Sequence, residues 1–301
     1  MSYPRGMSWE HFNMKEILFT TESGSDVPKE LQEKLGVIVL PMHVTMGEKT
    51  FDDGSIPISE LYDYFDRTGD TPKSSADNVQ DYIDFFTKLR EQHPDSVIYH
   101  FALAAGISTN YEHSVVAVRE FKDIYTIDTQ RFGAGCIAYI AEARALLNSK
   151  GGAEAITDYD ALFHEFDAIT DHIQCSFVPD SLEFLRAGGR VTNAAYIASN
   201  VLKIKPLIVP DKDGHLFAAG RYRGNMLKIC GRYIRDMCEK YDVKRDTLYI
   251  MYTEGVKQEV LDEMERTAKE LGFKRCSYDV CGAVITCHGG HAAIGLGMVL
   301  N

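Results

Sequence analysis

The residues best suited to chemistry crowd into one short stretch near the C-terminus, residues 285–295. Cys287, His288 and His291 lie there among three glycines, after an apolar run. A thiol and two imidazoles could bind a metal ion, an imidazole could transfer protons, and glycine-rich backbone could approach a phosphate closely. The stretch could equally be a strand that turns tightly into a helix, so each chemistry has to be weighed against simple packing.

The spacing of thiols and imidazoles does not favour a metal site. Zinc sites usually contain pairs of cysteines or histidines only a few residues apart. Here the cysteine gaps are wider, and the residues fall in an apolar strand pattern in which cysteine acts as a small hydrophobe. We therefore predict no bound metal for this group: Cys276, Cys281, Cys287, His288 and His291.

Nucleotide-binding motifs do not fit the sequence either. A dinucleotide site needs G-x-G-x-x-G between a strand and a helix, and the glycines at 289, 290, 295 and 297 are misspaced for it. The phosphate-loop pattern G-x-x-x-x-G-K-[ST] does not occur. We predict that the protein uses no cofactor.

Two clusters of hydroxyl side chains are better placed to bind a ligand. Ser74 and Ser75 lie in a predicted loop just before a helix, and Ser108 and Thr109 lie between a predicted strand and a helix. Each cluster could simply cap its helix, which is worth about 1 kcal/mol. At the carboxyl ends of parallel strands, however, the two clusters could present hydroxyls and backbone N–H groups to a carboxylate or phosphate in one cleft.

Ser108 and Arg190 each have a second interpretation. Ser108 could be the nucleophile of a serine hydrolase, although no G-x-S-x-G elbow surrounds it and chain order assigns it no histidine–acid pair. Arg190 follows Gly188 and Gly189, a pattern typical of the end of a helix. It is either a surface cation or a guanidinium that a rigid turn holds for anion binding.

The elements that must position these residues alternate between strand and helix in the first half of the chain. Apolar spacing predicts a helix over 78–91, a strand over 96–103, a helix over 109–121 and a strand over 124–127. This alternation predicts a parallel sheet with helices on both faces. In the second half, residues 211–214 form a hairpin turn between two predicted strands, which indicates a mixed sheet.

This change of pattern divides the chain. We expect a poorly ordered leader over 1–14, an N-terminal α/β domain over 15–165 and a C-terminal mixed-sheet α/β domain over 166–301. No low-complexity linker separates the domains, so they should pack closely. The predicted fold class is α/β.

Composition limits the partners of the protein. The 301 residues include 32 basic and 44 acidic side chains, a net charge of −12, which argues against non-specific binding of nucleic acid or anionic membranes. No apolar stretch is long enough to span a membrane, and the N-terminus lacks the apolar region of a secretory signal. Seven scattered cysteines, an odd number, indicate reduced thiols, so we predict a cytoplasmic protein.

Taken together, these motifs resemble the DegV family, the bacterial fatty-acid-binding proteins that hand an acyl chain to a fatty acid kinase. The resemblance runs from about residue 16 to the C-terminus and follows the order of the family's motifs. The matching stretches are TESGSDVP (21–28), FDDG (51–54), PKSS (72–75), ISTNY (107–111), LEFL through GGRV (182–191), IKPL (204–207) and ITCHGGHAAIG (285–295).

The resemblance implies a ligand tunnel between the two domains and a non-catalytic lipid-binding protein. Ser74 and Ser108 are its implied carboxylate donors, with Ser75 and Thr109 beside them. His288 and Arg190 are the implied basic residues near the head group, with roles when a separate kinase phosphorylates the carboxylate. A buried chain of about 16 carbons supplies roughly 11 kcal/mol at ~0.8 kcal/mol per methylene, so the tail dominates affinity and the donors set orientation.

Three departures from the family pattern bear on acyl-chain preference and kinase recognition. Ala104-Ala105-Gly106 replaces serines and so removes hydroxyls, Gly24 replaces a threonine, and His291 replaces a proline.

Three alternative functions stay open. The first is a serine hydrolase acting on acyl esters, which needs Ser108 or Ser74 within reach of a histidine. The others are a small-metabolite kinase, which needs a nucleotide site, and a metal-binding regulator, which needs stoichiometric zinc.

Overall fold

The structure is a computed structural model that describes residues 15–191 and 204–301. The predicted leader, residues 1–14, lies outside the described residues. None of the described helices is long and apolar enough to cross a membrane. All seven cysteines are free in the structure, and the prediction of reduced thiols in the cell stays a prediction.

The first half of the chain folds around a sheet of four parallel strands in the order β2-β1-β6-β7. The strands are β1 (Ile17–Glu22), β2 (Val37–Leu40), β6 (Val97–Ala102) and β7 (Ile124–Asp128). Every residue of the two central strands, β1 and β6, is buried, because helices cover both faces of the sheet. The predicted parallel sheet is confirmed.

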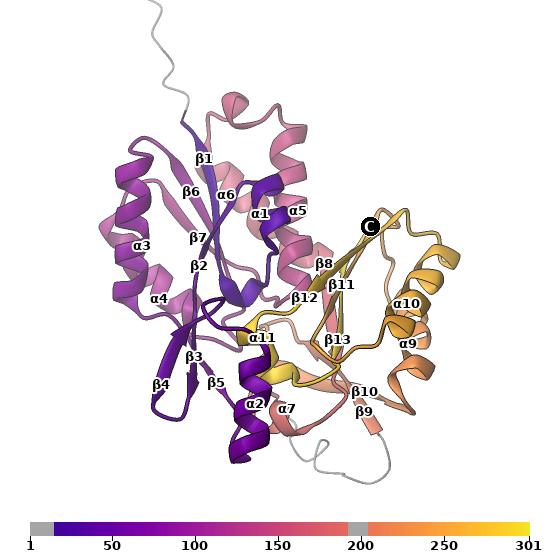
Figure 1. Cartoon of the computed structure of the whole chain (residues 1–301). Coiled ribbons are helices and arrows are strands. Elements are labelled where there is room, and N and C mark those ends of the chain that lie inside the picture. The colour runs from indigo at the N-terminus through magenta and orange to yellow at the C-terminus, as the bar shows by residue number, and fades with distance from the viewer. Residues whose placement is uncertain (1–14, 192–203) are drawn as a thin grey trace, which may run out of the picture.

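The helices of this half pack on opposite faces of the sheet (Figure 1). They are α1 (Lys29–Leu35), α3 (Val79–Gln92), α4 (Asn110–Ala117), α5 (Ala134–Ser149) and α6 (Tyr159–Asp167). On one face, Tyr82 and Phe86 of α3 pack with Leu18 and Ile98 of the sheet. On the other face, α5 and α6 pack against the opposite sides of the same strands. The predicted helices over 78–91 and 109–121 are confirmed as α3 and α4 with the turn η2 (Val118–Glu120) that follows it, whereas the sequence analysis did not predict α6.

A small third sheet, which the sequence did not predict, lies below the parallel sheet in Figure 1. Its antiparallel strands are β3 (His43–Met46), β4 (Lys49–Asp52) and β5 (Lys73–Ser75), in the order β4-β3-β5, and helix α2 (Ser59–Thr68) connects β4 to β5. The prediction of a loop over Ser74 and Ser75 was wrong, because both residues pair with β3. They do not cap α3 either: Asn78 does so, in a capping box with Asp81.

The second half of the chain forms a six-stranded mixed sheet in the order β10-β9-β8-β13-β11-β12. The strands are β8 (Ile173–Val178), β9 (Ile204–Pro210), β10 (Leu216–Arg223), β11 (Thr247–Tyr252), β12 (Arg275–Val280) and β13 (Ile294–Val299). Only β11 and β12 pair in parallel. The predicted hairpin turn is confirmed, since Gly214 adopts a left-handed φ of 80° between β9 and β10.

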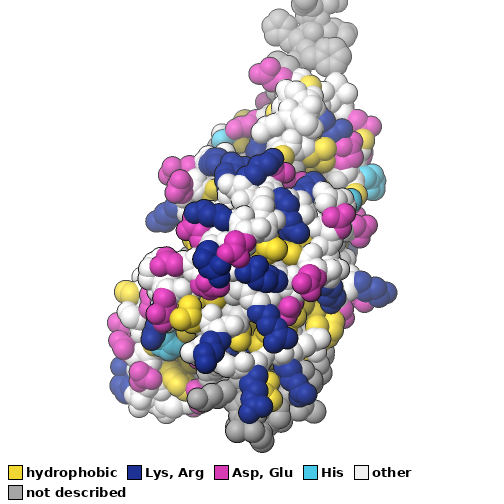
Figure 2. Space-filling model, turned by 90° about the vertical axis from the view of Figure 1, so that its right-hand side faces the viewer, with side chains coloured by type: hydrophobic (Ala, Val, Ile, Leu, Met, Phe, Trp, Pro, Cys, Tyr) yellow, Lys and Arg dark blue, Asp and Glu magenta, His cyan; other side chains and the backbone are white. Residues whose placement is uncertain are grey.

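Two amphipathic helices cover the outer face of this mixed sheet, α9 (Met226–Lys240) and α10 (Gln258–Glu270). On the right-hand side of the molecule, Lys and Arg side chains lie among Asp and Glu side chains (Figure 2). The two helices are joined by an ion pair between Arg235 and Glu270, whose charged atoms are 2.8 Å apart. This outer face is therefore a solvated, charged surface.

The remaining described helices are short, and two of them, α7 (Glu183–Gly188) and α11 (Ala283–Gly289), lie where the two halves meet. The others are the 3-10 turns η1 (Ser23–Ser25), η2 (Val118–Glu120), η3 (Ala153–Ala155) and η4 (Ala168–His172). Helix α11 corrects the sequence analysis, which placed Cys287 and His288 in a strand pattern. A single apolar run is compatible with either element, and the strand that follows it is β13.

Helix α5 joins the two halves by packing between their sheets. Glycine makes this approach possible: a Cβ at Gly297 of β13 would lie 2.1 Å from the carbonyl oxygen of Ala134, at the start of α5. Tyr139 of α5 is fully buried and bonds to the carbonyl oxygen of Phe166 at 2.6 Å. The architecture is α/β with a parallel and a mixed sheet, as predicted, whereas a domain boundary at 165/166 stays a prediction.

Candidate functional site

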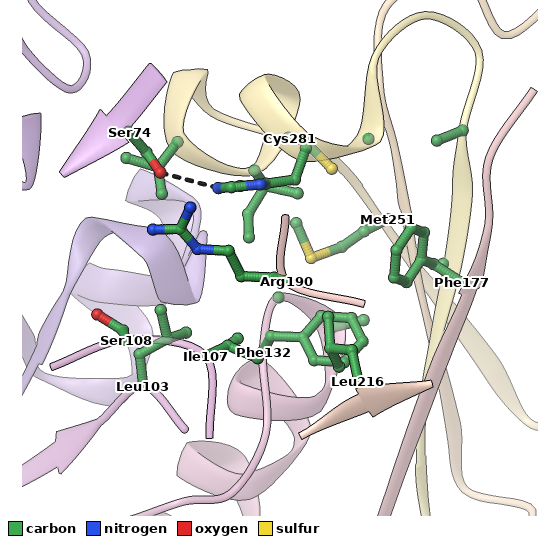
Figure 3. Close-up of a pocket in the computed structure, with 18 of the residues that line it drawn as sticks. Ser74, Leu103, Ile107, Ser108, Phe132, Phe177, Arg190, Leu216, Met251 and Cys281 are labelled. Carbon is green, nitrogen blue, oxygen red and sulfur yellow. Dashed lines mark hydrogen bonds between the residues drawn. The ribbon is translucent and has the colours of Figure 1, made fainter. Parts of the chain in front are cut away.

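The candidate site is a cavity of about 510 Å³ between the two halves of the molecule (Figure 3). Elements from both halves supply its wall: β5, the loop after β6, the start of α5, the end of α7, β11, α11 and β13. Its volume is that of pockets that enclose a small organic ligand. The cavity lies between the two halves, where the sequence analysis expects a ligand, and its use as a ligand site stays a prediction.

Most of the cavity wall is apolar. Phe132, Phe177, Leu216 and Met251 lie toward the right of the cavity in Figure 3, and Leu103 and Ile107 lie to their left. Phe132 and Phe177 pack edge to face, with ring centroids 5.6 Å apart. This part of the cavity suits an apolar chain, because it offers few hydrogen-bond partners to a polar one.

A hydrogen bond between Ser74 and His288 marks the polar end of the cavity. Ser74 Oγ lies 2.8 Å from His288 Nε2, although 214 positions of sequence separate the two residues. β5 carries the serine and α11 carries the histidine, so the contact crosses between the two halves of the chain. The sequence analysis named both residues for this cavity, and the fold brings them together.

Arg190 shapes the electrostatics of this polar end. It follows α7 in a turn at Gly189, which has a left-handed φ of 66°, and its Nη1 donates to the carbonyl oxygen of Gly188 at 2.6 Å. Desolvation by burial, together with the nearby Arg190 guanidinium, lowers the pKa of His288 to about 4. His288 is therefore neutral at pH 7, and its buried Nδ1 has no hydrogen-bond partner among the described residues.

The other predicted donors line the same cavity. Ser108 and Thr109 reach it from the loop after β6, and Ser75 reaches it from β5 beside Ser74. The Ser108 hydroxyl accepts a bond from the backbone N–H of Asn110 at 3.3 Å, so its proton remains free for another acceptor. All six predicted residues thus meet around one cavity, and their roles toward a ligand stay predictions.

Two carboxylates hold helix α11 in place, and the sequence analysis quoted them without assigning them a role. Asp26 accepts from the backbone N–H of Gly282, and Asp53 accepts from that of Ala283, each at 2.9 Å. They satisfy N–H groups that a helix start leaves open. Burial and the nearby Asp53 raise the pKa of Asp26. The sequence signal for this role was that Asp26 and Asp53 each lie in a motif of the family, TESGSDVP (21–28) and FDDG (51–54).

The rest of the glycine-rich stretch has a packing role. Cys287 is buried, and desolvation raises the pKa of its thiol to about 12, so the side chain packs as a small neutral hydrophobe. His291 is not among the residues that line the cavity, and its ring stacks on Tyr62 of α2, with ring centroids 3.5 Å apart. Its Nδ1 lies 3.2 Å from the carbonyl oxygen of Glu254. The substitution at His291 therefore affects a contact with α2.

The Ala104-Ala105-Gly106 departure has a steric explanation. The β9–β10 turn rests on this segment, and a Cβ at Gly106 would lie 2.4 Å from the backbone nitrogen of His215. A Cβ at Gly214 would in turn lie 2.9 Å from that of Ala104. Small residues on both sides allow the hairpin of the second half to close over the loop of the first.

This architecture defines a class of protein: two α/β units, one with a parallel and one with a mixed sheet, that enclose an apolar cavity with hydroxyl and basic groups at one end. The chain belongs to the DegV family, because residues 16–301 match the model of that family of uncharacterised proteins. A DegV domain-containing protein of Caldanaerobacter subterraneus is 27% identical over 292 residues, which cover 94% of this chain and 98% of the relative.

Solved structures share the fold at low identity. A DegV family protein from Thermus thermophilus, described as binding fatty acid, superposes with a TM-score of 0.81 at 22% identity, over 95% of this chain and all of that one (100%). A DegV family protein from Eubacterium eligens, loaded with heptadecanoic acid, has a TM-score of 0.78 at 16% identity, again over 95% and 100% of the two chains.

Proposed function

We propose that this protein binds a long-chain free fatty acid in the cavity between its two halves. The observation that carries the proposal is the division of one cavity into a large apolar wall and a single cluster of donors. An apolar tail of about 14 methylenes gains roughly 11 kcal/mol when it is fully buried, which exceeds any single polar contact. The family relatives from Thermus thermophilus and Eubacterium eligens, described with bound fatty acids, support this ligand class.

The carboxylate is proposed to lie at the polar end, within reach of Ser74 and Ser108. Both hydroxyls can donate to it, and Ser75 and Thr109 lie on the more exposed side of the same end. Arg190 supplies the positive charge that compensates the carboxylate. His288, neutral and bonded to Ser74, fixes the direction of that hydroxyl.

We propose that the bound carboxylate is presented to a separate fatty acid kinase and that this chain performs no bond-breaking step. Thr109 and Arg190 are exposed, so the carboxylate end of the cavity lies toward the surface while the tail is enclosed. A second protein that approaches this end could reach the carboxylate without displacing the acyl tail from the cavity. The apolar wall then serves only to hold the acid.

A serine hydrolase acting on acyl esters is the second candidate, because Ser74 and His288 are within hydrogen-bond distance. Two features oppose it. A catalytic histidine is held and polarised by an acid at its other nitrogen, whereas no described residue bonds to Nδ1 of His288. A histidine whose pKa is about 4 is also a weak general base at neutral pH.

Denaturing extraction of the purified protein, followed by lipid mass spectrometry, tests the proposal. We expect a long-chain fatty acid in the extract, and the lipid-free protein should rebind palmitate. Protein that carries no fatty acid and does not rebind one would contradict the proposal. Turnover of p-nitrophenyl palmitate that is abolished in Ser74→Ala would instead establish the hydrolase.

A further inference from the structure

A second cluster of polar side chains lies behind the strand that carries Ser74 and Ser75. It consists of His43 on β3, Asp77 just before α3, and Asp81 in the first turn of α3. One ligand atom from each residue lies within 4.8 Å of the other two. Because β3 pairs with β5, with His43 opposite Ser75, the cluster borders the candidate site without lining its cavity.

Asp77 is the unusual member of this cluster. The residue is 0% exposed, and neither carboxylate oxygen has a hydrogen-bond partner among the described residues. Its backbone is fixed on both sides, since its N–H donates to Asn110 Oδ1 at 3.1 Å and its carbonyl oxygen lies 2.6 Å from His113 Nδ1. A buried carboxylate without partners is costly, so a rigid backbone that holds one in place points to a missing ligand.

His43 directs a nitrogen at this carboxylate. Its Nδ1 lies 3.1 Å from Asp52 Oδ1, while its Nε2 lies 3.8 Å from Asp77 Oδ1 and 3.9 Å from Asp81 Oδ2. When Nδ1 donates its proton to Asp52, the lone pair of Nε2 faces two carboxylate oxygens. In the described part of the chain, no lysine or arginine forms an ion pair with Asp77 or Asp81.

We propose that His43, Asp77 and Asp81 bind one divalent transition-metal ion of the zinc type. Two ligands of a tetrahedral zinc ion stand ~3.4 Å apart, so the distances of 3.8 and 3.9 Å from His43 Nε2 to the two carboxylate oxygens need to shorten by about half an ångström. The two carboxylate oxygens lie within 4.8 Å of each other. One imidazole and two carboxylates favour zinc, manganese or cobalt over magnesium or calcium, which prefer oxygen ligands alone. Asp52 then serves as the carboxylate that orients a metal-bound histidine.

The ion would fix the small sheet to α3 and so hold β5 in place. The sequence did not indicate this site, since His43 lies on a strand that was not predicted and far from the two aspartates along the chain. The proposal replaces our expectation that the protein binds no metal. It is independent of the fatty acid, whose cavity holds none of the three ligands.

The test uses the full-length protein, stripped with a chelator and then titrated with zinc chloride. We expect one zinc ion per chain by elemental analysis after dialysis, and binding at least tenfold weaker in His43→Ala and in Asp77→Asn. His215→Ala is the matched control, because His215 belongs to an exposed group with Asp211 and Asp213 whose ligand atoms are equally close. Zinc should bind this variant as tightly as it binds the natural protein.

Asp77→Asn preserves the shape of the buried side chain, and its melting temperature verifies that the variant is folded. Zinc should raise the melting temperature of the natural protein but not that of this variant. Cobalt provides a second measurement, because its visible spectrum distinguishes nitrogen and oxygen ligands from cysteine sulfur. The proposal is overturned by a protein that retains no zinc, by equal affinity in Asp77→Asn, or by a sulfur-ligand spectrum.

Discussion

The contact between Ser74 and His288 shows how one residue pair can serve either catalysis or binding. The same 2.8 Å hydrogen bond would activate a nucleophile if His288 were a good base with an acid behind it. Burial and Arg190 remove that capacity because they lower the pKa of His288 to about 4, which makes the imidazole a weak base. What remains is a hydroxyl that is held in one orientation beside a guanidinium, an arrangement suited to binding an anion.

Replacement of Ser74 by alanine should weaken palmitate binding by about 10- to 100-fold, the equivalent of one hydrogen bond to a charged group. Titration calorimetry on lipid-free protein measures the effect. Ser149→Ala is the matched control, since Ser149 lies at the exposed end of α5 and bonds only to the carbonyl oxygen of Leu146. Equal affinities in both variants would remove Ser74 from the site.

The pKa of His288 should rise when a carboxylate enters the cavity. In the free protein, its pKa of about 4 lies below the ordinary value of 6.5, so the stability this group contributes is present above pH 6.5 and is lost as the pH falls through 4. A bound carboxylate favours the imidazolium form. Binding therefore takes up protons, and affinity should increase as the pH falls through the raised pKa of the loaded protein, over the range in which the fatty acid itself is still ionised.

NMR titration of the His288 ring, with and without palmitate, measures this shift. Loading with hexadecanol is the control, because the alcohol fills the cavity without adding a charge and should leave the pKa low. An unchanged pKa in the palmitate-loaded protein would place the carboxylate elsewhere.

Among the elements, α11 has the greatest influence on the site. It is a short helix, too short to be stable alone, and Asp26 and Asp53 hold its N-terminus from the opposite half of the chain. The helix presents His288 only because these two bonds set its position. Residues in two motifs far from the cavity can thus control the geometry at the head group.

Asp53→Ala should lower the free energy of unfolding by about 1 kcal/mol and also weaken palmitate binding several-fold, because α11 loses one of its two anchors. Asp158→Ala is the matched control. Asp158 caps α6 through the N–H of Ala161 at 2.9 Å, away from the cavity, so its loss should cost similar stability and leave affinity unchanged. Chemical denaturation and calorimetry measure both quantities. Equal palmitate affinities in the two variants would show that Asp53 only stabilises the fold.

The sequence predicted elements with a strong apolar period and missed those defined by distant partners. Side-chain spacing predicted the helix over 78–91 and the strands of the parallel sheet, because the residues that each element buries form a continuous apolar pattern in its own sequence. Strand β5 is short and pairs with β3 across residues far apart in the chain, so no local pattern reveals it. Strand β3 also forms a local hairpin with β4 around Gly47, a turn signal that the sequence analysis missed. The motifs identified the residues of the site but not the bonds between them.

For the molecule as a whole, the cavity depends on how closely its two halves approach. The β9–β10 turn covers the loop over 104–106, and the residues next to this contact, Ile107, Ser108 and Leu216, line the cavity. Small residues over 104–106 allow the turn and the loop to lie in direct contact. Acyl-chain preference in this protein should therefore depend on the contact between hairpin and loop.

Gly106→Ala should displace the turn, because the new Cβ would lie 2.4 Å from backbone. We expect a destabilisation of about 1–3 kcal/mol and a loss of palmitate affinity. Gly220→Ala is the control: it lies in β10, and its Cβ would approach no atom closer than 3.8 Å. Thermal melting and calorimetry compare the two variants. If the Gly106→Ala protein kept the stability and palmitate affinity of the natural protein, the close contact between the β9–β10 turn and the loop over 104–106 would not be needed for either property.

The most direct test of the central claim is a crystal structure of the protein loaded with palmitate. We predict that the carboxylate lies within hydrogen-bond distance of Ser74 Oγ, on the side of Arg190, and that the tail extends along Phe132, Leu216 and Met251. A reversed chain, with its carboxylate among these apolar side chains, or a cavity that excludes the acid, would contradict it.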